Sequence, residues 1–479
     1  MGSVGKRCVV GLGLLFLFLF AATYAHQWPF DCPTALSRLD LLHALTTGTV
    51  AIDAYDNTPD RAEFAGHYYS DKAPGAVVVA LPGFVIGAVF LKIIGIVLES
   101  DAGWLYSSWI ACFASVGIVA ATGAFFLFKW LLQYVSPQAS FITTLAIFLG
   151  ASPLVYATML FSHSLVAGCL AIGLWAVNPP LDRPADRFRS KGWLGHHWRD
   201  LLAGFLCGWA LASEYTSGIV VTGLLLWQLS NGKSRAICFS LAALPPLLLI
   251  PFYSWMCFHN PFILPYSLHV SFPQMKEGIF AIGWPILEIT FNLLFSPARG
   301  LFFWTPFLIM AIAGYWRLLR INRRLFWLVY AVPILQVVII SGRVWDWQAG
   351  PTLGARYLTP ILPFLALPCA LGVQCLPRIG TALALYSVGI TTLAILTNAS
   401  PASSTKDPLL DLHIPLLLQG EFSPNLGRVV GLPPYASIAF YYLVMSGGIY
   451  WIWRRVNALP FPPALREEEY HSTLISHET

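Results

Sequence analysis

Charged residues are scarce in this chain. Asp, Glu, Lys and Arg make up 11% of its 479 residues, whereas soluble domains average roughly 25%. So low a fraction excludes an ordinary soluble globular domain, and the 57% of hydrophobic residues agrees with that conclusion. The net charge of +5 comes from short basic clusters beside apolar segments, so the sequence carries no nucleic-acid signal.

Metal-binding and disulfide patterns of cysteine are also missing. The nine Cys residues show no CxxC or CxxH spacing, and most lie inside apolar runs. This pattern argues against a disulfide framework or a cysteine metal site, and we interpret the cysteines as small buried hydrophobic residues. The sequence also shows no internal repeat and no stretch typical of a separate soluble domain.

Long apolar runs are the main feature of the sequence. A helix needs about 20 apolar residues to cross the hydrocarbon core. The runs therefore predict an all-α polytopic membrane protein with about 11 to 13 transmembrane helices. One membrane domain covers residues 1–460, and a short polar tail covers 461–479. The predicted spans are 8–25, 75–98, 104–128, 138–160, 162–178, 201–228, 236–257, 302–319, 325–341, 357–376, 379–397 and 436–453.

The basic residues suggest a topology. Lys6 and Arg7 precede the first span, and the bias of Lys and Arg towards cytoplasmic loops predicts that the next loop faces outwards. A retained first helix is favoured over a cleaved signal peptide, because the run is long and more spans follow. If the segments over 138–160 and 162–178 both crossed the membrane fully, the basic cluster at 183–199 would lie outside, against the cytoplasmic bias of Lys and Arg. We therefore expect one early segment to be re-entrant or broken at Pro153. The predicted outward loops are 26–74, 258–300, 342–356 and 398–435.

The polar loop from Asp53 to Gly75 concentrates ionisable residues. It follows a predicted interfacial helix over 33–47 and places ten ionisable side chains in about 20 residues. Carboxylates in this loop can act as general bases or hold a divalent cation. Lys72 stands directly before the next span, where its ammonium can meet a lipid phosphate at headgroup height. A solvated loop with a lysine anchor at the membrane edge is the alternative interpretation.

Three segments carry a family resemblance: HYYSDKAPG (His67–Gly75), SPARGLF (Ser296–Phe302) and WDWQAGPTLGARYLTPILPFLALP (Trp345–Pro368). They resemble elements of family 39-type glycosyltransferases, which include protein O-mannosyltransferases, aminoarabinose transferases of lipid A and many bacterial relatives. The resemblance implies a GT-C-like helix bundle in the bacterial inner membrane. It also implies a polyprenyl-phosphate sugar donor and a lipid, glycan or protein acceptor on the outer face.

The catalytic base is predicted among three carboxylates. Many relatives place an Asp-Glu pair just after the first span, whereas this chain has only Asp31 there. The base is therefore Asp31, Asp53 or Asp60, and Asp53 is preferred because it follows the interfacial helix closely and lies in the charged loop. A direct displacement at the anomeric carbon would invert its configuration.

Substrate-binding residues are predicted from position and chemistry. Lys72, Arg299 and Arg356 each stand close before an apolar run, where a fixed cation can bind the donor phosphate. Aromatic faces beside hydrogen-bonding groups suit sugar rings, and such groups occur in the outward loops 26–74 and 342–356. The predicted substrate contacts are His67, Tyr68, Tyr69, Trp345, Asp346 and Trp347.

Two ionisable residues, His163 and Glu214, lie inside predicted spans. Such residues are costly in a membrane and either face a cavity or pair with each other. We favour a pair that locks two helices over a lining of the donor groove. A transporter or flippase is the main alternative function, and an assembly protein whose loop docks a partner is the second. The absence of an inverted repeat and the dense charged outer loop favour the enzyme.

Overall fold

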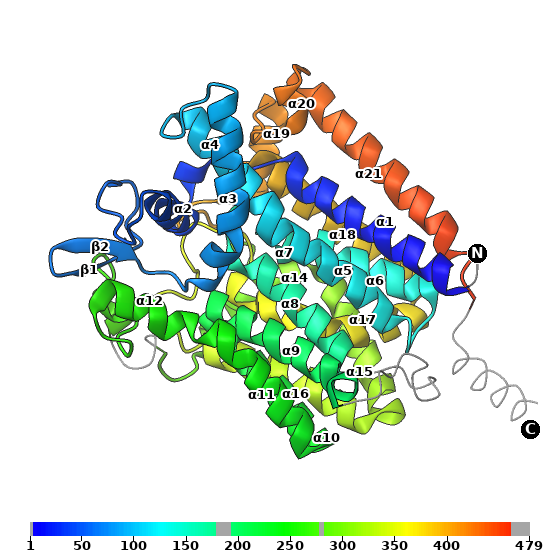
Figure 1. Cartoon of the computed structure of the whole chain (residues 1–479). Helices are drawn as coiled ribbons and strands as arrows, with labels where there is room; N and C mark the ends of the chain where they lie inside the picture. Colours follow the sequence, from blue (N-terminus) through cyan, green and yellow to red (C-terminus); the bar gives the residue numbers. More distant parts are fainter. Residues whose placement is uncertain (1–2, 179–192, 277–281, 461–479) are drawn as a thin grey trace, which may run out of the picture.

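Helices make up most of the structure. The computed structural model describes residues 3–178, 193–276 and 282–460, so the predicted polar tail lies outside the described residues. Within those ranges, eight helices are long and apolar enough to cross a membrane. They confirm the prediction of an all-α polytopic membrane protein (Figure 1).

The long spans alternate with shorter helices. The spans are formed by α1 (Ser3–Tyr24), α3 (Gly75–Ile93), α4 and α5 (Asp101–Cys112 and Ile118–Leu131, joined by the π-helical turn η2, Phe113–Gly117), α11 and α12 (Lys233–Leu247 and Leu249–Phe258), α16 (Arg323–Ile340), η7 with α17 (Arg356–Ile361 and Leu362–Cys375), α18 (Pro377–Thr397) and α21 (Pro434–Val456). The other α-helices are α2 (Pro33–Thr46), α6 (Pro137–Leu149), α7 (Ser152–Val155), α8 (Ser162–Val177), α9 (Trp193–Ser213), α10 (Gly218–Asn231), α13 (Leu287–Phe295), α14 (Leu301–Trp304), α15 (Met310–Ile321), α19 (Ile414–Gln419) and α20 (Leu426–Val429). Short turns of other helix types are η1 (Pro29–Asp31), η3 (Tyr215–Ser217), η4 (Pro265–Leu268), η5 (Pro273–Lys276), η6 (Pro306–Ile309) and η8 (Leu409–His413).

Several of the predicted spans are interrupted. The segment predicted over 138–160 breaks where α6 ends and α7 begins, with Pro153 in the first turn of α7. Proline has no N–H donor and its ring clashes with the preceding turn, so the helix does not continue through it. The segment predicted over 201–228 divides at Glu214, whose extended backbone separates α9 from η3. The described chain therefore has fewer full-length spans than the 11 to 13 predicted.

Helix α2, predicted to lie at the membrane interface, is enclosed by the rest of the protein. All ten residues from Ala35 to Ala44 are buried. The cause is the packing around it: α3, η1 and the strand β2 (His67–Ser70) all contact α2. In Figure 1, α2 is seen nearly end-on between the β-hairpin and α3.

The charged loop contains a β-hairpin that the sequence reading treated as irregular. Strands β1 (Arg61–Phe64) and β2 pair antiparallel, with Arg61 opposite Ser70 and Phe64 opposite His67. The two-residue turn has positive φ angles at Ala65 (52°) and Gly66 (83°). Positive φ at both positions is typical of the type I′ turn, which matches the twist of a hairpin. This pairing decides which polar residues of the loop face one another.

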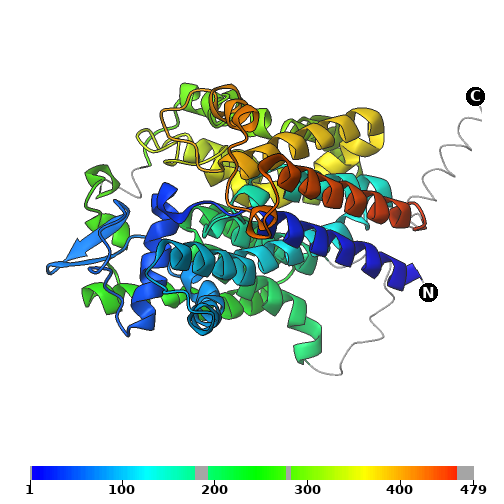
Figure 2. The same ribbon diagram turned by 90° about the horizontal axis from the view of Figure 1, so that it is seen from above.

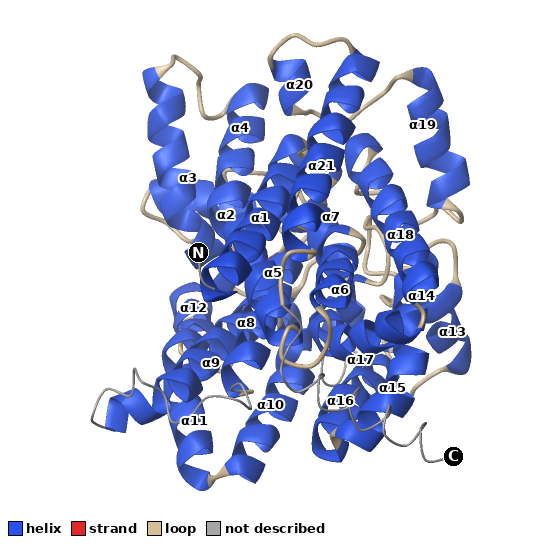
Figure 3. Cartoon of the chain, turned by 90° about the vertical axis from the view of Figure 1, so that its right-hand side faces the viewer, coloured by secondary structure: helices blue, strands red, loops and turns tan. Residues whose placement is uncertain are grey.

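The hairpin and the start of the chain lie at opposite ends of the bundle. Figure 2 shows β1, β2 and α2 at one end, and the beginning of α1 with the end of α21 at the other. Helices α1 and α21 pack side by side, as Figure 3 also shows. The charged loop is thus separated from Lys6 and Arg7 by the length of the bundle.

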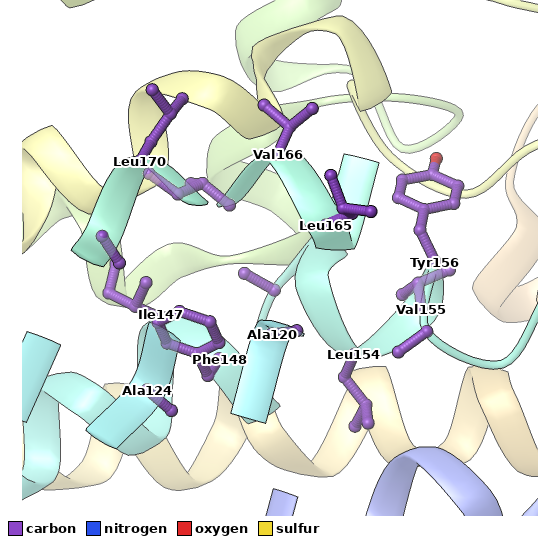
Figure 4. Close-up of a cluster of buried hydrophobic side chains, with 14 of the residues drawn as sticks. Ala120, Ala124, Ile147, Phe148, Leu154, Val155, Tyr156, Leu165, Val166 and Leu170 are labelled. Atoms are coloured by element: carbon purple, nitrogen blue, oxygen red, sulfur yellow. The ribbon is translucent and has the colours of Figure 1, made fainter. Parts of the chain in front are cut away.

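The core of the bundle is built around α5, α6, α7 and α8. Its helices approach closely where small residues meet: a Cβ placed on Gly123 of α5 would lie 2.5 Å from the Cα of Gly168 of α8. Large apolar side chains fill the space beside this contact, and the phenol of Tyr156 lies at the edge of the cluster (Figure 4). The labelled residues are Ala120, Ala124, Ile147, Phe148, Leu154, Val155, Tyr156, Leu165, Val166 and Leu170.

Candidate functional site

Lys72 is the centre of a buried ion-pair cluster. Its Nζ lies 2.8 Å from Oδ2 of Asp60 and 2.7 Å from Oδ2 of Asp71. All three side chains are at least nine-tenths buried. Thr34 on α2 donates a 2.8 Å hydrogen bond to Asp60, and Nε2 of His269 lies 3.5 Å from Asp71. The cluster therefore joins α2, the two sides of the hairpin and the segment after η4.

The hairpin register explains this arrangement. Asp60 directly precedes β1 and Asp71 directly follows β2, and the pairing of Arg61 with Ser70 brings these two ends together. The main chain is held in place by Tyr253, whose hydroxyl donates a 2.9 Å hydrogen bond to the Ser70 carbonyl. Two carboxylates so close together in a buried site require a cation between them.

Electrostatics favour the ionised form of the cluster. Burial alone would raise the pKa of the Asp71 carboxyl, but Lys72 and His269 lower it overall. Burial alone would lower the pKa of the Lys72 ammonium, but the two carboxylates raise it well above its usual value. Lys72 is thus a fixed cation. Of its three N–H donors, two point to Asp60 and Asp71.

A second charged cluster lies around Tyr357. Its hydroxyl donates a 2.7 Å hydrogen bond to Oδ2 of Asp346, which also pairs with Nη2 of Arg343 at 2.8 Å. Arg356 reaches the Tyr357 hydroxyl with one Nη at 3.4 Å, and its guanidinium lies 5.2 Å from the ring centre of Phe161. Its Nε and other Nη are buried without a hydrogen-bond partner among the described residues.

Arg38 and Glu214 connect the two clusters. Arg38 of α2 donates a 3.2 Å hydrogen bond to Ser162, which donates a 3.0 Å bond to Glu214. Nε2 of His163 lies 3.8 Å from the same Glu214 oxygen. Arg38 lies near enough to both Asp71 and Arg356 for its charge to interact with theirs. His163 and Glu214 thus link α8 to the break after α9, and they also lie beside the charged clusters.

A cavity of about 390 Å³ opens beside these groups. Its polar end is formed by Glu214, Tyr266, Arg343 and Tyr357. Its apolar wall comes from α10 and α16 and includes Ile219, Thr222, Leu335 and Ile339. The volume lies within the range of ligand pockets, roughly 300–1,000 Å³. Because half of the Leu335 surface is exposed on α16, the apolar wall reaches the lipid-facing side of the bundle.

Tyr266 relates the cavity to both clusters. It lines the cavity, and its ring centre lies 5.9 Å from Nζ of Lys72. Glu214 and Tyr357 line the same cavity. Tyr266 thus lies between Lys72 of the opening loop and the cavity that Arg343 and Tyr357 line.

The preferred base, Asp53, lies elsewhere. Its carboxylate accepts 2.6 Å hydrogen bonds from the N–H of Tyr68 and from Nδ1 of His67. Its side chain is 41% exposed, on the outer side of the hairpin. Partial burial would raise the pKa of Asp53, but these hydrogen bonds lower it overall. The structure gives Asp53 a role in holding the hairpin, and it places Asp60 rather than Asp53 beside Lys72.

The remaining hairpin residues also shape the loop. His67 is exposed beside Asp53, and Tyr68 lies under the guanidinium of Arg61, 4.2 Å from ring centre to Cζ. Tyr69 packs its ring against Phe258 of α12. These contacts hold the hairpin against its surroundings and keep its turn at the end of the bundle.

Asp31, Arg299 and the two tryptophans differ in their surroundings. Asp31 is exposed in η1; its main-chain N–H donates to the Trp28 carbonyl at 3.2 Å, and its main-chain carbonyl accepts from Ser400 at 3.3 Å. Arg299 is buried and donates to three main-chain carbonyls, of Ala298, Gln348 and Gly350. Its described donors are thus used to hold the 348–350 loop. Trp345 packs on Phe272, whereas Trp347 is half-buried against the core.

Several residues of the site were missed by the sequence reading. Asp71 was noted only as part of the charged loop. Tyr266 and His269 lie in a predicted outward loop and carry no motif. Arg38 had a detectable signal, because it is a cation inside a helix whose other positions are mostly apolar. The partners that reveal its importance, Ser162 and Glu214, are distant in sequence and could not be paired without the fold.

Comparisons with known proteins identify no family for this chain: no family model matches it and no curated protein matches it. Among the described residues, no group of three or more His, Cys, Asp or Glu side chains is placed to hold a metal ion. The divalent cation and the glycosyltransferase activity therefore stay predictions.

Proposed function

We propose that this protein is a membrane glycosyltransferase that transfers a sugar from a polyprenyl-phosphate donor to an acceptor hydroxyl. The observation that carries the proposal is the cavity beside α10 and α16, which has an apolar wall and is also lined by the cation of Arg343 and the carboxylate of Glu214. A lipid-linked sugar phosphate has matching parts: an apolar chain, an anionic phosphate and a sugar. The family resemblance of the three sequence segments supports the same reaction.

The donor phosphate binds at Arg356 and Arg343. Arg356 has two buried nitrogen atoms without a hydrogen-bond partner among the described residues. Leaving a buried donor unsatisfied costs about 1–3 kcal/mol, more for a charged group. A phosphate oxygen at this position satisfies them, and guanidinium groups match phosphate geometry well. The apolar wall of α10 and α16 then receives the prenyl chain from the lipid side.

Asp60 is the base in this proposal. It takes the proton from the acceptor hydroxyl, whose oxygen forms the new bond to the anomeric carbon as the bond to the phosphate oxygen breaks. The polyprenyl phosphate leaves with the bonding electrons, and the arginines stabilise its added charge. Asp60 is preferred over Asp71 because its side chain is 10% exposed whereas that of Asp71 is 0% exposed. Lys72 positions Asp60 and directs its third N–H donor to the substrate.

The proposed topology follows from the two ends of the bundle. Lys6 and Arg7 lie at the end opposite the hairpin, and such residues favour the cytoplasm. The hairpin end then faces outwards, and in a bacterium this corresponds to the outer side of the inner membrane. Acceptors on that side include lipids, glycans and proteins.

A transporter or flippase is the second candidate. The breaks at Pro153 and Glu214 favour it, because transporters often bind their substrates at interrupted helices. Glu214 lines the cavity, so this break lies at the proposed donor site. The same geometry also suits an enzyme that admits a lipid from the side.

One experiment separates the two candidates. The purified full-length chain in nanodiscs is given a panel of radiolabelled polyprenyl-phosphate sugars with membrane-extract acceptors. We expect sugar transfer by the native chain and by Glu63→Gln, a carboxylate change on the exposed side of β1, and none by Asp60→Asn. No transfer from any donor, together with movement of the lipid-linked sugar across proteoliposomes, would instead establish transport.

A further inference from the structure

Helices α1 and α21 form an apolar groove away from the candidate site. The groove has a volume of about 430 Å³ and is open to the surroundings of the bundle along these two spans. Leu12 and Phe16 on α1 and Trp451 on α21 are 44%, 65% and 46% exposed. Apart from these three, it is lined by Val9, Gly13, Leu17, Phe20, Val444, Gly448 and Ile452.

Small residues create the groove. A Cβ on Gly13 would lie 2.9 Å from Ile452, and a Cβ on Gly448 would lie 2.8 Å from Leu17. The two helices therefore approach closely at the glycines, and the larger side chains beside them leave a furrow. These contacts also show that the helices run antiparallel, so the start of α1 lies beside the end of α21 (Figures 2 and 3).

Cationic side chains gather at one end of this groove. Lys6 and Arg7 stand at the start of α1, and Arg454 and Arg455 at the end of α21. Lys6 shares a helix face with the groove-lining Val9 and Gly13, because residues three and four apart lie on one side of a helix. The guanidinium of Arg455 lies over the ring of the groove-lining Trp451, at 5.3 Å. Both cations are exposed.

We propose that the groove between α1 and α21 binds one anionic glycerophospholipid, with an acyl chain in the groove and the headgroup phosphate between Lys6 and Arg455. An apolar furrow inside the bilayer accepts a hydrocarbon chain. Basic residues at the end of transmembrane helices attract anionic headgroups. A zwitterionic lipid fills the furrow equally well but gains less from the cations. The proposal is independent of the activity proposed for the other end of the bundle.

The charge pattern distinguishes this occupant from a protein helix. A partner helix packed along the furrow would place its own terminus beside four cations and would need acidic residues there. A bilayer lipid supplies both the chain and the negative charge in one molecule. It is also present at high concentration in the membrane wherever the protein lies.

Photo-crosslinking tests the proposal. The full-length chain is reconstituted in phosphatidylcholine vesicles with a small fraction of phosphatidylglycerol that carries a diazirine on one acyl chain, and labelled peptides are identified by mass spectrometry. A phosphatidylcholine probe with the same chain is the reference. We expect several-fold more labelling of α1 and α21 by the phosphatidylglycerol probe than by the phosphatidylcholine probe. In the double variant Lys6→Gln with Arg455→Gln, labelling by the phosphatidylglycerol probe should fall about fivefold for each cation removed.

Two further variants keep the result interpretable. Lys233→Gln with Arg235→Gln removes the same charge at the start of α11, away from the groove, and should leave the labelling unchanged. Leu12→Trp fills the groove from its exposed edge and should reduce labelling by both probes. Equal labelling by the two probes, or full labelling after loss of Lys6 and Arg455, would overturn the proposal. Labelling that survives Leu12→Trp but not the charge change would show binding by the headgroup alone, outside the groove.

Discussion

Asp60 and Lys72 form a 2.8 Å ion pair at the base of the hairpin, with both side chains buried. The two residues belong to opposite sides of the hairpin and meet because Arg61 pairs with Ser70. Their contact joins the charged loop to α2 through Thr34 and to the cavity through Tyr266. The relationship makes the loop part of a defined site.

Replacing Asp60 by Asn should remove sugar transfer. General-base catalysis contributes typically 10²–10⁴-fold, so we expect kcat to fall by roughly that factor. Lys72 keeps its 2.7 Å partner Asp71, so the variant should still fold and bind donor. Transfer assays and donor-binding measurements on the same preparation check both points. Unchanged kcat in Asp60→Asn would exclude this residue as the base.

Replacing Asp53 by Asn should affect the hairpin more than the reaction. Asp53 accepts hydrogen bonds from His67 and from the Tyr68 N–H, and its pKa is lowered. Because the folded-state pKa is below the unfolded value, the stability from this carboxylate is present above its unfolded pKa and is lost as the pH falls. The native hairpin should therefore become more sensitive to protease below about pH 4, and Asp53→Asn should remove that pH dependence. A loss of transfer equal to that of Asp60→Asn would return the catalytic role to Asp53.

Replacing Lys72 by Met should destabilise the fold. It leaves Asp60 and Asp71 close together and buried without their cation. Breaking a buried pair in this way typically costs about 3–5 kcal/mol. The double change Lys72→Met with Asp71→Asn should recover much of the stability, since one of the two charges is removed. Thermal unfolding in detergent measures the difference, and equal losses in the single and double variants would contradict the ion-pair explanation.

Replacing Arg356 by Gln should weaken donor binding. Hydrogen bonds to charged groups contribute about 1.5–3 kcal/mol, so the donor KM should rise roughly 10- to 100-fold. Arg299→Gln is the matched comparison, because its described hydrogen bonds go to main-chain carbonyls. That variant should lower thermal stability and leave the donor KM close to the native value. The reverse result would make Arg299 the phosphate contact.

The pH dependence of stability should depend on Asp40. Burial in α2 raises the pKa of this carboxyl to about 8, although the amide of Asn57, 3.1 Å away, partly opposes the shift. Because the folded-state pKa is raised, this contribution to stability is fully present below the unfolded value near 4 and is lost as the pH rises through 8. The unfolding temperature should therefore fall between pH 5 and pH 9. Asp40→Asn should flatten that slope, and a slope unchanged in the variant would assign it to another group.

The sequence predicted the class of protein and pointed to the charged loop of the candidate site. Low charge and long apolar runs were sufficient for a polytopic helical membrane protein, because the bilayer requires such runs whatever their packing. Lys72 could be selected because charge density and position before a span are local properties. The break near Pro153 was expected for the same reason, since proline acts on its own turn.

The sequence could not decide which carboxylate of the charged loop lies beside Lys72. Asp53 and Asp60 lie in one charged loop and have the same chemistry, so only the hairpin register separates them: it places Asp60 against Lys72 and leaves Asp53 with His67. The burial of α2, predicted to be interfacial, likewise depends on neighbours supplied by α3 and β2.

By itself, then, the sequence determined that this protein lies in a membrane. The hydrophobicity of each segment depends only on the residues of that segment and not on the rest of the chain. The tertiary structure decided which charges meet. Arg38, Glu214 and Arg356 come from three separate regions, and Ser162, from a fourth, accepts from Arg38 and donates to Glu214. Hydrogen bonds and contact ion pairs require their atoms to lie within about 3–4 Å, so such contacts are fixed only once the helices have packed.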